Sequence, residues 1–357
     1  MQKGFRKIIL AALLASMVYN IVSDSTVAEA AFDLETSAKS AIVMSADGRT
    51  VFEKNADERR LIASTTKLMT ALVAIELSRG DEVITVAPEC CGIEGTSMYL
   101  RPGQSLTVDE LLQGLLLASG NDAAEALAVG LCGSEAAFVE RMNAKAAELG
   151  LDHTAFANPH GLDAEEYGST ARDLARLMLA CMEQERFARL SALRSCQVGE
   201  NYYVNHNKLL EQLEGCIGGK TGYTRAAGRC LVSCCERDGM RFVCVTLSDP
   251  DDWNDHIRLY EAAFAAWERR RVVSVDEAFE IPLVMGQEDC AIASPERELT
   301  LALPRDEVPE LVRELPLFAF APVRKGEYAG RIVVLCDGEA VDEIPLLYNK
   351  TILQAKE

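Results

Sequence analysis

The sequence of 357 residues is poor in basic side chains relative to acidic ones. Lysine and arginine together number 36, against 55 aspartates and glutamates, which gives a formal net charge of -19. Such an acidic chain is repelled by a phosphate backbone, so we expect no nucleic-acid partner. We find neither an internal repeat nor a low-complexity tract. With 49% hydrophobic and 25% charged residues the composition is typical of a globular protein, and the length is sufficient for two domains.

The sequence also lacks the cysteine spacings of a zinc site. Its twelve cysteines include no Cys-x-x-Cys pair and no Cys/His cluster with zinc-ligand spacing. Cys90-Cys91 and Cys234-Cys235 are adjacent pairs. Cys230, Cys234 and Cys244 lie in apolar, strand-like runs, where cysteine serves as a small hydrophobe. We therefore expect mostly free, buried thiols, although export would permit disulfides and the sequence leaves their status open.

The first thirty residues have the features of a signal peptide. Lys3, Arg6 and Lys7 form a basic segment, the apolar residues 8–18 follow, and Ala28-Glu29-Ala30 fits the small-x-small cleavage rule. The apolar run is too short for a comfortable membrane span, so we expect export with cleavage near Ala30 rather than an uncleaved anchor. Cleavage would remove three basic and two acidic side chains and change the net charge from -19 to -20.

The order of the expected elements is strands, then helices, then strands again. A hairpin is expected at residues 40–54, because Asp47-Gly48 separates two strand-like runs. A helix that begins at Ser64 should be buried, because apolar side chains cover most of its surface. These side chains are Leu68, Met69, Leu72, Val73, Ile75 and Leu77. Further helices are expected within residues 105–190, further strands at 216–221, 229–236 and 241–247, and a closing helix at 253–267.

This order predicts an α/β (α+β) fold in which the last strands return to pair with the opening hairpin. The sheet would then be mostly antiparallel, flanked by helices and interrupted by an inserted helical subdomain. From about Ser274 the sequence changes to short alternating strands, which indicates a small all-β domain. The predicted division is a signal peptide at 1–30, a main domain at 31–273 and a β-rich domain at 274–357.

Ser64 and Lys67 form the most informative local pattern. Residues three apart in a helix share a face, so the serine hydroxyl and the lysine amine can approach hydrogen-bonding distance. A serine nucleophile needs a base in this position. A lysine buried on an apolar helix loses its proton more readily, as a general base must. Alone, Ser-x-x-Lys is a weak signal, because such pairs arise often by chance.

Two later motifs supply what this pair lacks. Ser119-Gly120-Asn121 lies between two expected helices, where the serine can relay a proton and the amide can hold a substrate backbone. Lys220-Thr221-Gly222 lies at the end of an expected strand, where the lysine and threonine can bind a carboxylate and the glycine allows close approach of an extended substrate. Each motif is weak alone, but together they are specific.

The ordered trio resembles class A β-lactamases and penicillin-binding proteins. More of the chain is similar to one branch, the serine-type D-alanyl-D-alanine carboxypeptidases, or low-molecular-mass penicillin-binding proteins. The similarity covers roughly residues 35–350. It is carried by residues 63–71, 119–124, 158–162, 220–224 with 227–228, and 321–326, the last resembling the C-terminal β domain of the family.

The resemblance implies a serine DD-peptidase in which Ser64 attacks the carbonyl between two terminal D-alanines of a peptidoglycan stem peptide. Lys67 would be the general base, Ser119 would help to protonate the leaving D-alanine, and Asn121 would position the acyl part. The backbone N–H groups of Ser64 and Tyr223 would form the oxyanion hole. Lys220 and Thr221, with Gly222 beside them, would receive the terminal carboxylate. The reaction would need no metal or cofactor, and β-lactams would be covalent inhibitors.

Several neighbouring residues receive a more modest interpretation. His160, within Asn158-Pro159-His160-Gly161-Leu162, is read as part of a structured loop because lysine already fills the base role. The other three histidines, at 153, 206 and 256, are assigned no chemistry, and residues 205–209 are treated as support near the site. An arginine partner for the substrate carboxylate is not located, although Arg225 is near the third motif.

Two alternative functions stay open at this point. A class A β-lactamase would need a glutamate for deacylation; Glu165 and Glu166 are available, but without the Glu-x-x-Leu-Asn context of that enzyme. A penicillin-binding scaffold with little turnover would act through the β domain. Carboxypeptidase and endopeptidase activity are not separated by the sequence. The signal peptide leads us to expect an extracytoplasmic protein. The final residues are too few for a convincing amphipathic anchor, and its membrane association is left open.

Overall fold

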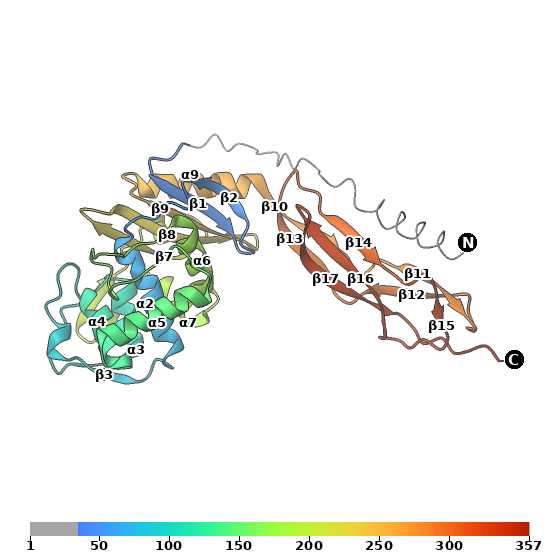
Figure 1. Cartoon of the computed structure of the whole chain (residues 1–357), viewed down its shortest axis with the longest axis horizontal. Helices are drawn as coiled ribbons and strands as arrows, with labels where there is room; N and C mark the ends of the chain where they lie inside the picture. Colours follow the sequence, from blue (N-terminus) through green and yellow to red (C-terminus); the bar gives the residue numbers. More distant parts are fainter. Residues whose placement is uncertain (1–34, 357) are drawn as a thin grey trace, which may run out of the picture. The chain divides into compact units, whose positions relative to one another are not determined.

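The structure is a computed structural model, and it describes residues 35–356. The predicted signal peptide lies outside the described residues. The main domain is built on a five-stranded sheet in the order β2-β1-β9-β8-β7, with every neighbouring pair antiparallel (Figure 1). Its strands are β1 (Ser40–Ser45), β2 (Thr50–Lys54), β7 (Cys216–Thr224), β8 (Gly228–Arg237) and β9 (Met240–Leu247).

The sheet lies between two layers of helices. α9 (Asp252–Ala266) covers one face, and α6 (Ala171–Met182), with the rest of the helical subdomain, covers the other (Figure 1). Every residue of β1 is buried, because a strand covered on both faces has no solvent side. β1 pairs with β2 through the turn at Asp47-Gly48, where Gly48 has φ of +87°, and with β9 along its other edge. The predicted hairpin and the predicted return of the last strands are therefore confirmed.

The chain between β2 and β7 forms the inserted helical subdomain. Its helices are α2 (Lys67–Glu76), α3 (Val108–Leu116), α4 (Asn121–Cys132), α5 (Glu135–Glu148), α6, α7 (Glu185–Ser191) and α8 (Leu209–Gln212). Two short antiparallel strand pairs accompany them, formed by β3 (Val83–Thr85) with β4 (Ser105–Thr107) and by β5 (Ser195–Val198) with β6 (Asn201–Val204).

Local sequence signals set the ends of several of these helices. The Thr107 hydroxyl accepts from the Glu110 N–H while the Glu110 carboxylate accepts from the Thr107 N–H, so the predicted capping box is present. At the starts of α5 and α6 the Ser134 and Thr170 hydroxyls accept from the N–H groups of Ala137 and Asp173, without the reciprocal bond of a capping box. These caps satisfy backbone donors that helix formation leaves without partners.

The C-terminal residues form β strands around a second, smaller apolar core. β10 (Trp267–Val273) pairs with β13 (Leu299–Pro304), and a six-stranded sheet has the order β14-β16-β17-β12-β11-β15. Its strands are β11 (Phe279–Val284), β12 (Cys290–Pro295), β14 (Glu310–Glu314), β15 (Ala319–Phe320), β16 (Tyr328–Cys336) and β17 (Glu339–Tyr348). A mixed α/β domain with an inserted helical subdomain, followed by a β domain, agrees with the predicted fold class.

Three details differ from the expectations. α2 begins at Lys67, because residues 63–66 form a 3₁₀ turn. Leu77 was expected to be buried, but it is 38% exposed because α2 ends at Glu76. Trp267 begins strand β10 instead of ending the closing helix. The polar run Glu268-Arg269-Arg270-Arg271 has no strand-like alternation of apolar residues, and this segment forms a strand by pairing with β13. The division at residue 273 thus falls between β10 and the strands that follow, and it stays a prediction.

Among residues 35–356, no helix combines the length and apolar character needed to cross a membrane.

Candidate active site

Ser64 lies in the tight 3₁₀ turn Ala63–Thr66 that leads into α2. The turn begins with an unusual backbone conformation, since Ala63 has φ of +47°, a region that residues other than glycine rarely adopt. Ala63 is fully buried, so its surroundings hold this conformation. Strained backbone of this kind is characteristic of functional sites, where it fixes the direction of a neighbouring side chain.

Lys67 is the first residue of α2, and its amine is surrounded by three oxygen atoms. Lys67 Nζ lies 2.8 Å from Ser64 Oγ, 2.7 Å from Asn121 Oδ1 and 2.7 Å from the His160 carbonyl oxygen. The amide of Asn121 is oriented by its Nδ2, which donates to the Glu94 carbonyl at 2.5 Å. The structure therefore brings Ser64, Lys67 and Asn121 together, from segments more than fifty positions apart.

Burial controls the charge of Lys67. Its side chain has no exposed surface, and α2 is buried along nine of its ten residues. Desolvation, assisted by the nearby Lys220, lowers the pKa of Lys67 well below the usual lysine value, although Asp122 acts in the opposite direction. An amine with a lowered pKa gives up its proton more readily and is suited to act as a base.

Ser119 and Lys220 form a second pair on the other side of the site. Lys220 Nζ, on β7, donates to Ser119 Oγ at 2.9 Å and to the Thr221 carbonyl at 2.8 Å. Ser119 has φ of +58°, a second non-glycine residue in the left-handed region. Lys220 is 1% exposed, and burial lowers its pKa to about 7. The second and third motifs thus meet through a direct hydrogen bond.

Gly222 has a role that the sequence interpretation did not anticipate. A Cβ at this position would lie 3.0 Å from the Ile62 carbonyl oxygen and 3.1 Å from the backbone nitrogens of Ser64 and Thr65. The glycine therefore allows β7 to approach the turn that carries Ser64. The missing side chain sets the spacing between the strand and the turn that carries Ser64. The close approach of an extended substrate to Gly222 stays a prediction.

An open cleft of about 430 Å³ runs past these residues, within the size range of small-ligand sites. Lys67 and Lys220 lie behind its wall, buried, and present their amines to Ser64 and Ser119. Tyr223 is 68% exposed at the rim. Six of the eight predicted site residues line the cleft: Ser64, Ser119, Asn121, Thr221, Gly222 and Tyr223.

The cleft also contains residues that the sequence interpretation missed. Arg229 lines it, forms an ion pair with Asp252 at 2.6 Å, and lies over the ring of Trp253 at 5.7 Å from the centroid. Arg225 is not among the cleft-lining residues of the described chain. The pairing of Tyr223 with Arg229 across β7 and β8 is the signal that could have located this arginine, because it follows once the two strands are placed in register.

The histidines divide into two groups. His160 and His206 line the cleft, and the backbone of His160 holds Lys67, which supports the structured-loop interpretation and adds a specific contact to it. His256 is buried elsewhere, between the hydroxyls of Ser233 and Thr246. His153, like His256, is outside the cleft lining.

Comparison with known proteins identifies the family of the chain. The family profile described as D-alanyl-D-alanine carboxypeptidase (Peptidase_S11) matches residues 25–251. The chain is 31% identical over 341 residues to the D-alanyl-D-alanine carboxypeptidase DacF of Bacillus subtilis, covering 90% of this chain and 88% of that protein. It is 30% identical over 328 residues to DacC of Escherichia coli, covering 86% and 82%. Penicillin binding protein 5 of Haemophilus influenzae matches in structure with a TM-score of 0.71 and 25% identity, over 90% of this chain and 99% of that one. The chain therefore belongs to the D-alanyl-D-alanine carboxypeptidase family, the serine-type low-molecular-mass penicillin-binding proteins.

Proposed function

We propose that this enzyme removes the terminal D-alanine from peptidoglycan stem pentapeptides through an acyl-enzyme on Ser64. The observation that carries the proposal is the environment of Lys67 Nζ, which lies within 2.8 Å of the Ser64 hydroxyl and has two carbonyl oxygens as its other neighbours. Membership of the family supplies the reaction class, and this geometry supports the assignment of each residue.

The three contacts of Lys67 agree with a neutral amine that acts as a base. A neutral amine has two N–H donors and one lone pair. Asn121 Oδ1 and the His160 carbonyl are acceptors only, so they take the two donors. The lone pair is then left for the Ser64 hydroxyl. Lys67 in this state can remove the serine proton, which is the task of the general base.

Acyl transfer then proceeds in two steps. The Ser64 oxygen forms a bond to the carbonyl carbon between the two D-alanines, and its proton passes to Lys67. The bond from that carbon to the leaving nitrogen breaks, and Ser119, hydrogen-bonded to Lys220, relays a proton to the departing amine. Water hydrolyses the resulting ester and restores the serine. The backbone N–H groups of Ser64 and Tyr223 would stabilise the oxyanion, each contributing about 3 kcal/mol.

The terminal carboxylate of the substrate is assigned to the cationic part of the cleft. Lys220 supplies buried positive charge, and the Thr221 hydroxyl is a neutral donor in the cleft wall. We add Arg229 to this set, because its guanidinium lines the same cleft and its side chain is 41% exposed. A planar guanidinium is well suited to a carboxylate.

The two alternatives are less well supported. A class A β-lactamase mechanism requires a glutamate in the cleft, but Glu165 and Glu166 are exposed and are absent from its lining in the described chain. A scaffold with little turnover would not require a buried lysine held against a serine hydroxyl, since burying such a group is costly. β-Lactams are expected to acylate Ser64 and to leave it slowly, over many minutes.

The direct test is incubation of the enzyme with a pentapeptide ending in D-Ala-D-Ala, followed by assay of free D-alanine. One D-alanine per peptide is expected. Ser64→Ala should reduce the rate by about four orders of magnitude or more and abolish covalent penicillin labelling, because both need the same oxygen. Thr85→Ala, an exposed hydroxyl on β3, is a matched control that should retain both activities. D-alanine release that survives Ser64→Ala would show that another residue is the nucleophile.

We also propose that the enzyme acts outside the cytoplasm, where its peptidoglycan substrate is found. The sequence of residues 1–30 supports export, and the degree of membrane association is tested by cell fractionation with N-terminal sequencing of the mature protein. A mature chain that begins near residue 31 in a soluble extracytoplasmic fraction is expected. A chain that begins at Met1 in the membrane fraction would indicate an uncleaved anchor.

A further inference from the structure

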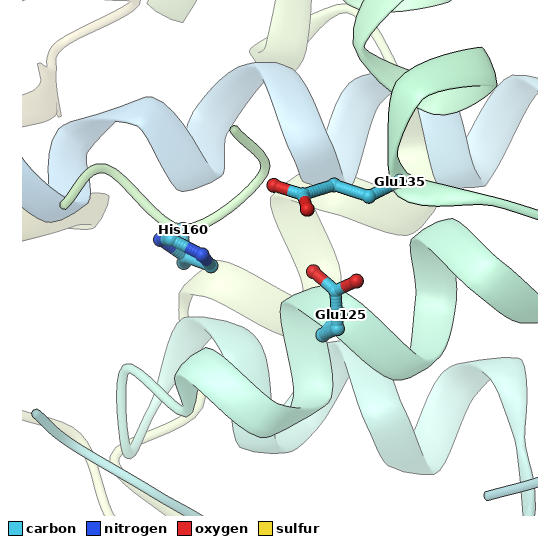
Figure 2. Close-up of side chains that lie close together, drawn as sticks. All are labelled: Glu125, Glu135 and His160. Atoms are coloured by element: carbon cyan, nitrogen blue, oxygen red, sulfur yellow. The ribbon is translucent and has the colours of Figure 1, made fainter. Parts of the chain in front are cut away.

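A second cluster of polar side chains adjoins the loop that holds Lys67. Its members are Glu125, Glu135 and His160, and Figure 2 shows their carboxyl groups and imidazole around one space. One ligand atom from each side chain lies within 4.8 Å of those from the other two. The three residues come from α4, from the first turn of α5 and from the loop that follows α5, so the tertiary structure alone brings them together. The acyl-transfer scheme uses none of these three side chains.

Glu125 is the unusual member, because it is buried without a partner. It is 7% exposed, and its Oε2 is buried and makes no hydrogen bond within residues 35–356. No lysine or arginine of that range forms an ion pair with Glu125 or Glu135. Burial, with the nearby charges of Glu135 and Glu89, raises the pKa of Glu125 to about 7. A buried carboxylate in this condition is costly unless a cation or a proton compensates it.

We propose that Glu125, Glu135 and His160 bind one divalent transition-metal cation, with Zn²⁺ as the best match to these ligands. One imidazole nitrogen and two carboxylate oxygens are a donor set that suits Zn²⁺ and neighbouring metals better than Mg²⁺ or Ca²⁺, which prefer oxygen alone. Two carboxylates balance the charge of a dication, and three protein ligands leave a fourth position for water. Glu135 is only partly buried and His160 lines the cleft, so the ion has a route from solvent.

The existing contacts of Glu125, Glu135 and His160 allow their side chains to move onto a metal ion. Zn²⁺ ligands at about 2.0–2.1 Å from the metal lie roughly 3.4 Å apart in a tetrahedron. The donor atoms lie within 4.8 Å of one another, so each pair needs to close by at most about 1.4 Å. The two glutamates can supply that movement by rotating their flexible side chains. The pKa of His160 is lowered to about 4, chiefly by burial, so the imidazole is neutral and has a lone pair to offer. Its ring makes one long hydrogen bond, from the Leu162 N–H to Nδ1 at 3.3 Å, which coordination through the other nitrogen would give up.

The ion would connect the segments that position the general base. Glu125 lies one helical turn after Asn121 on α4, on the same helix face, and Asn121 Oδ1 is one acceptor for Lys67. His160 supplies the second acceptor through its carbonyl oxygen. An ion held by Glu125 and His160 would therefore fix both acceptors relative to each other. This is a positioning role, and the ion takes no part in making or breaking bonds to the substrate.

Metal binding by the full chain tests this inference. The enzyme is treated with chelator, dialysed, and titrated with Zn²⁺ by calorimetry, and metal content is measured after gel filtration. One Zn²⁺ per chain is expected, together with a higher Tm in its presence. Glu125→Gln and Glu135→Gln should each weaken binding by about 100-fold, since each removes a charged ligand while keeping the side-chain shape. Glu140→Gln, on the exposed face of α5, is the matched control and should bind as the parent does.

Two further measurements make the result decisive. Co²⁺ as a probe separates this site from the twelve thiols, because a site without sulfur gives no thiolate-to-cobalt charge-transfer band. Ser64→Ala should bind Zn²⁺ as the parent does, so a failure of the proposed catalytic assignment would not affect this test. Absence of stoichiometric binding, or binding that persists in the Glu125→Gln/Glu135→Gln double variant, would overturn the inference and leave two carboxyl groups that share a proton.

Discussion

The main domain and the C-terminal β domain bury different kinds of side chain. Within residues 35–356, every buried polar or charged side chain lies between Thr36 and His256, and none lies in residues 267–356. The β domain has an apolar core that includes Ile281, Ile332 and Ile344. The main domain has a larger apolar core and also buries Lys67, Lys220 and Glu125.

This difference shows where the fold tolerates an energetic cost. Removing a lysine amine from water is unfavourable unless hydrogen bonds or loss of the charge compensate it. Lys67 and Lys220 receive both kinds of compensation, since each has hydrogen-bond partners and a lowered pKa. Buried ionisable groups with shifted pKa values are concentrated at functional sites. The β domain needs no such groups, because its packing can be satisfied by apolar side chains alone.

The largest effect expected in the main domain concerns the charge of Lys220. Lys220→Met should lower kcat/KM by about 10²- to 10³-fold, because the substrate carboxylate loses its buried cationic partner. In the parent enzyme, kcat/KM should fall on the alkaline side as Lys220 loses its proton, with a midpoint at about pH 7, because burial lowers the pKa of Lys220 to that value in the free enzyme. Steady-state kinetics from pH 6 to 11 test both expectations.

A control for that profile is Lys220→Arg, whose guanidinium stays protonated throughout the range. Loss of the alkaline limb in this variant would assign the limb to residue 220. A profile of the parent that stays level past pH 10.5 would contradict the role of Lys220.

A smaller effect is expected at Arg229. Arg229→Gln should raise KM for the pentapeptide about tenfold with little change in kcat, because a partly exposed guanidinium contributes to ground-state binding of the carboxylate. Arg225→Gln, outside the cleft lining of the described chain, is the matched control and should leave KM within about twofold. Equal effects of the two substitutions would mean that Arg229 acts only through general charge.

The apolar core of the β domain allows a test of whether the two regions are separable. Ile332 is fully buried in β16, and Ile332→Val should lower the free energy of unfolding by about 1 kcal/mol, since one methylene is lost from a packed core. The rate of β-lactam acylation should be unchanged. Ile42→Val in β1 of the main domain serves for comparison. A fall in acylation rate with Ile332→Val would show that the β domain supports the chemistry.

The smallest differences are expected among the cysteines. The structure gives all twelve as free thiols, and seven are buried. Burial raises the pKa of Cys230 to about 11 and that of Cys336 to about 12, so both should be protonated at pH 8. Alkylation of the folded enzyme at that pH, followed by mass spectrometry, should first modify the five half-buried cysteines, at positions 91, 132, 196, 216 and 290, and denaturation should expose the seven buried ones. Recovery of disulfide-linked peptides from unreduced protein would contradict the prediction of free thiols.

Much of the architecture could be predicted because its signals are local. Asp47-Gly48 specifies a hairpin, and Thr107 with Glu110 specifies a helix start, through contacts within a few residues. The pairing of β1 with β9 could be predicted from chain order, since the last strands have few other places to pair. The strand β10 could not be predicted, because its charged side chains do not follow a strand pattern and its extended form depends on pairing with β13.

The active site shows the same division between local and long-range information. The sequence by itself determined the three motifs, because each needs particular residue types at short spacing, and it determined that Lys67 would be buried on an apolar helix. Only the tertiary structure decided which oxygens surround Lys67 and that Gly222 leaves space for the turn that carries Ser64. It also decided that Arg229, and not Arg225, lines the cleft. The meeting of Glu125, Glu135 and His160 was equally undecided by sequence. Each of these depends on contacts between segments far apart in the chain, whose distances are set by packing and strand register and leave no local pattern.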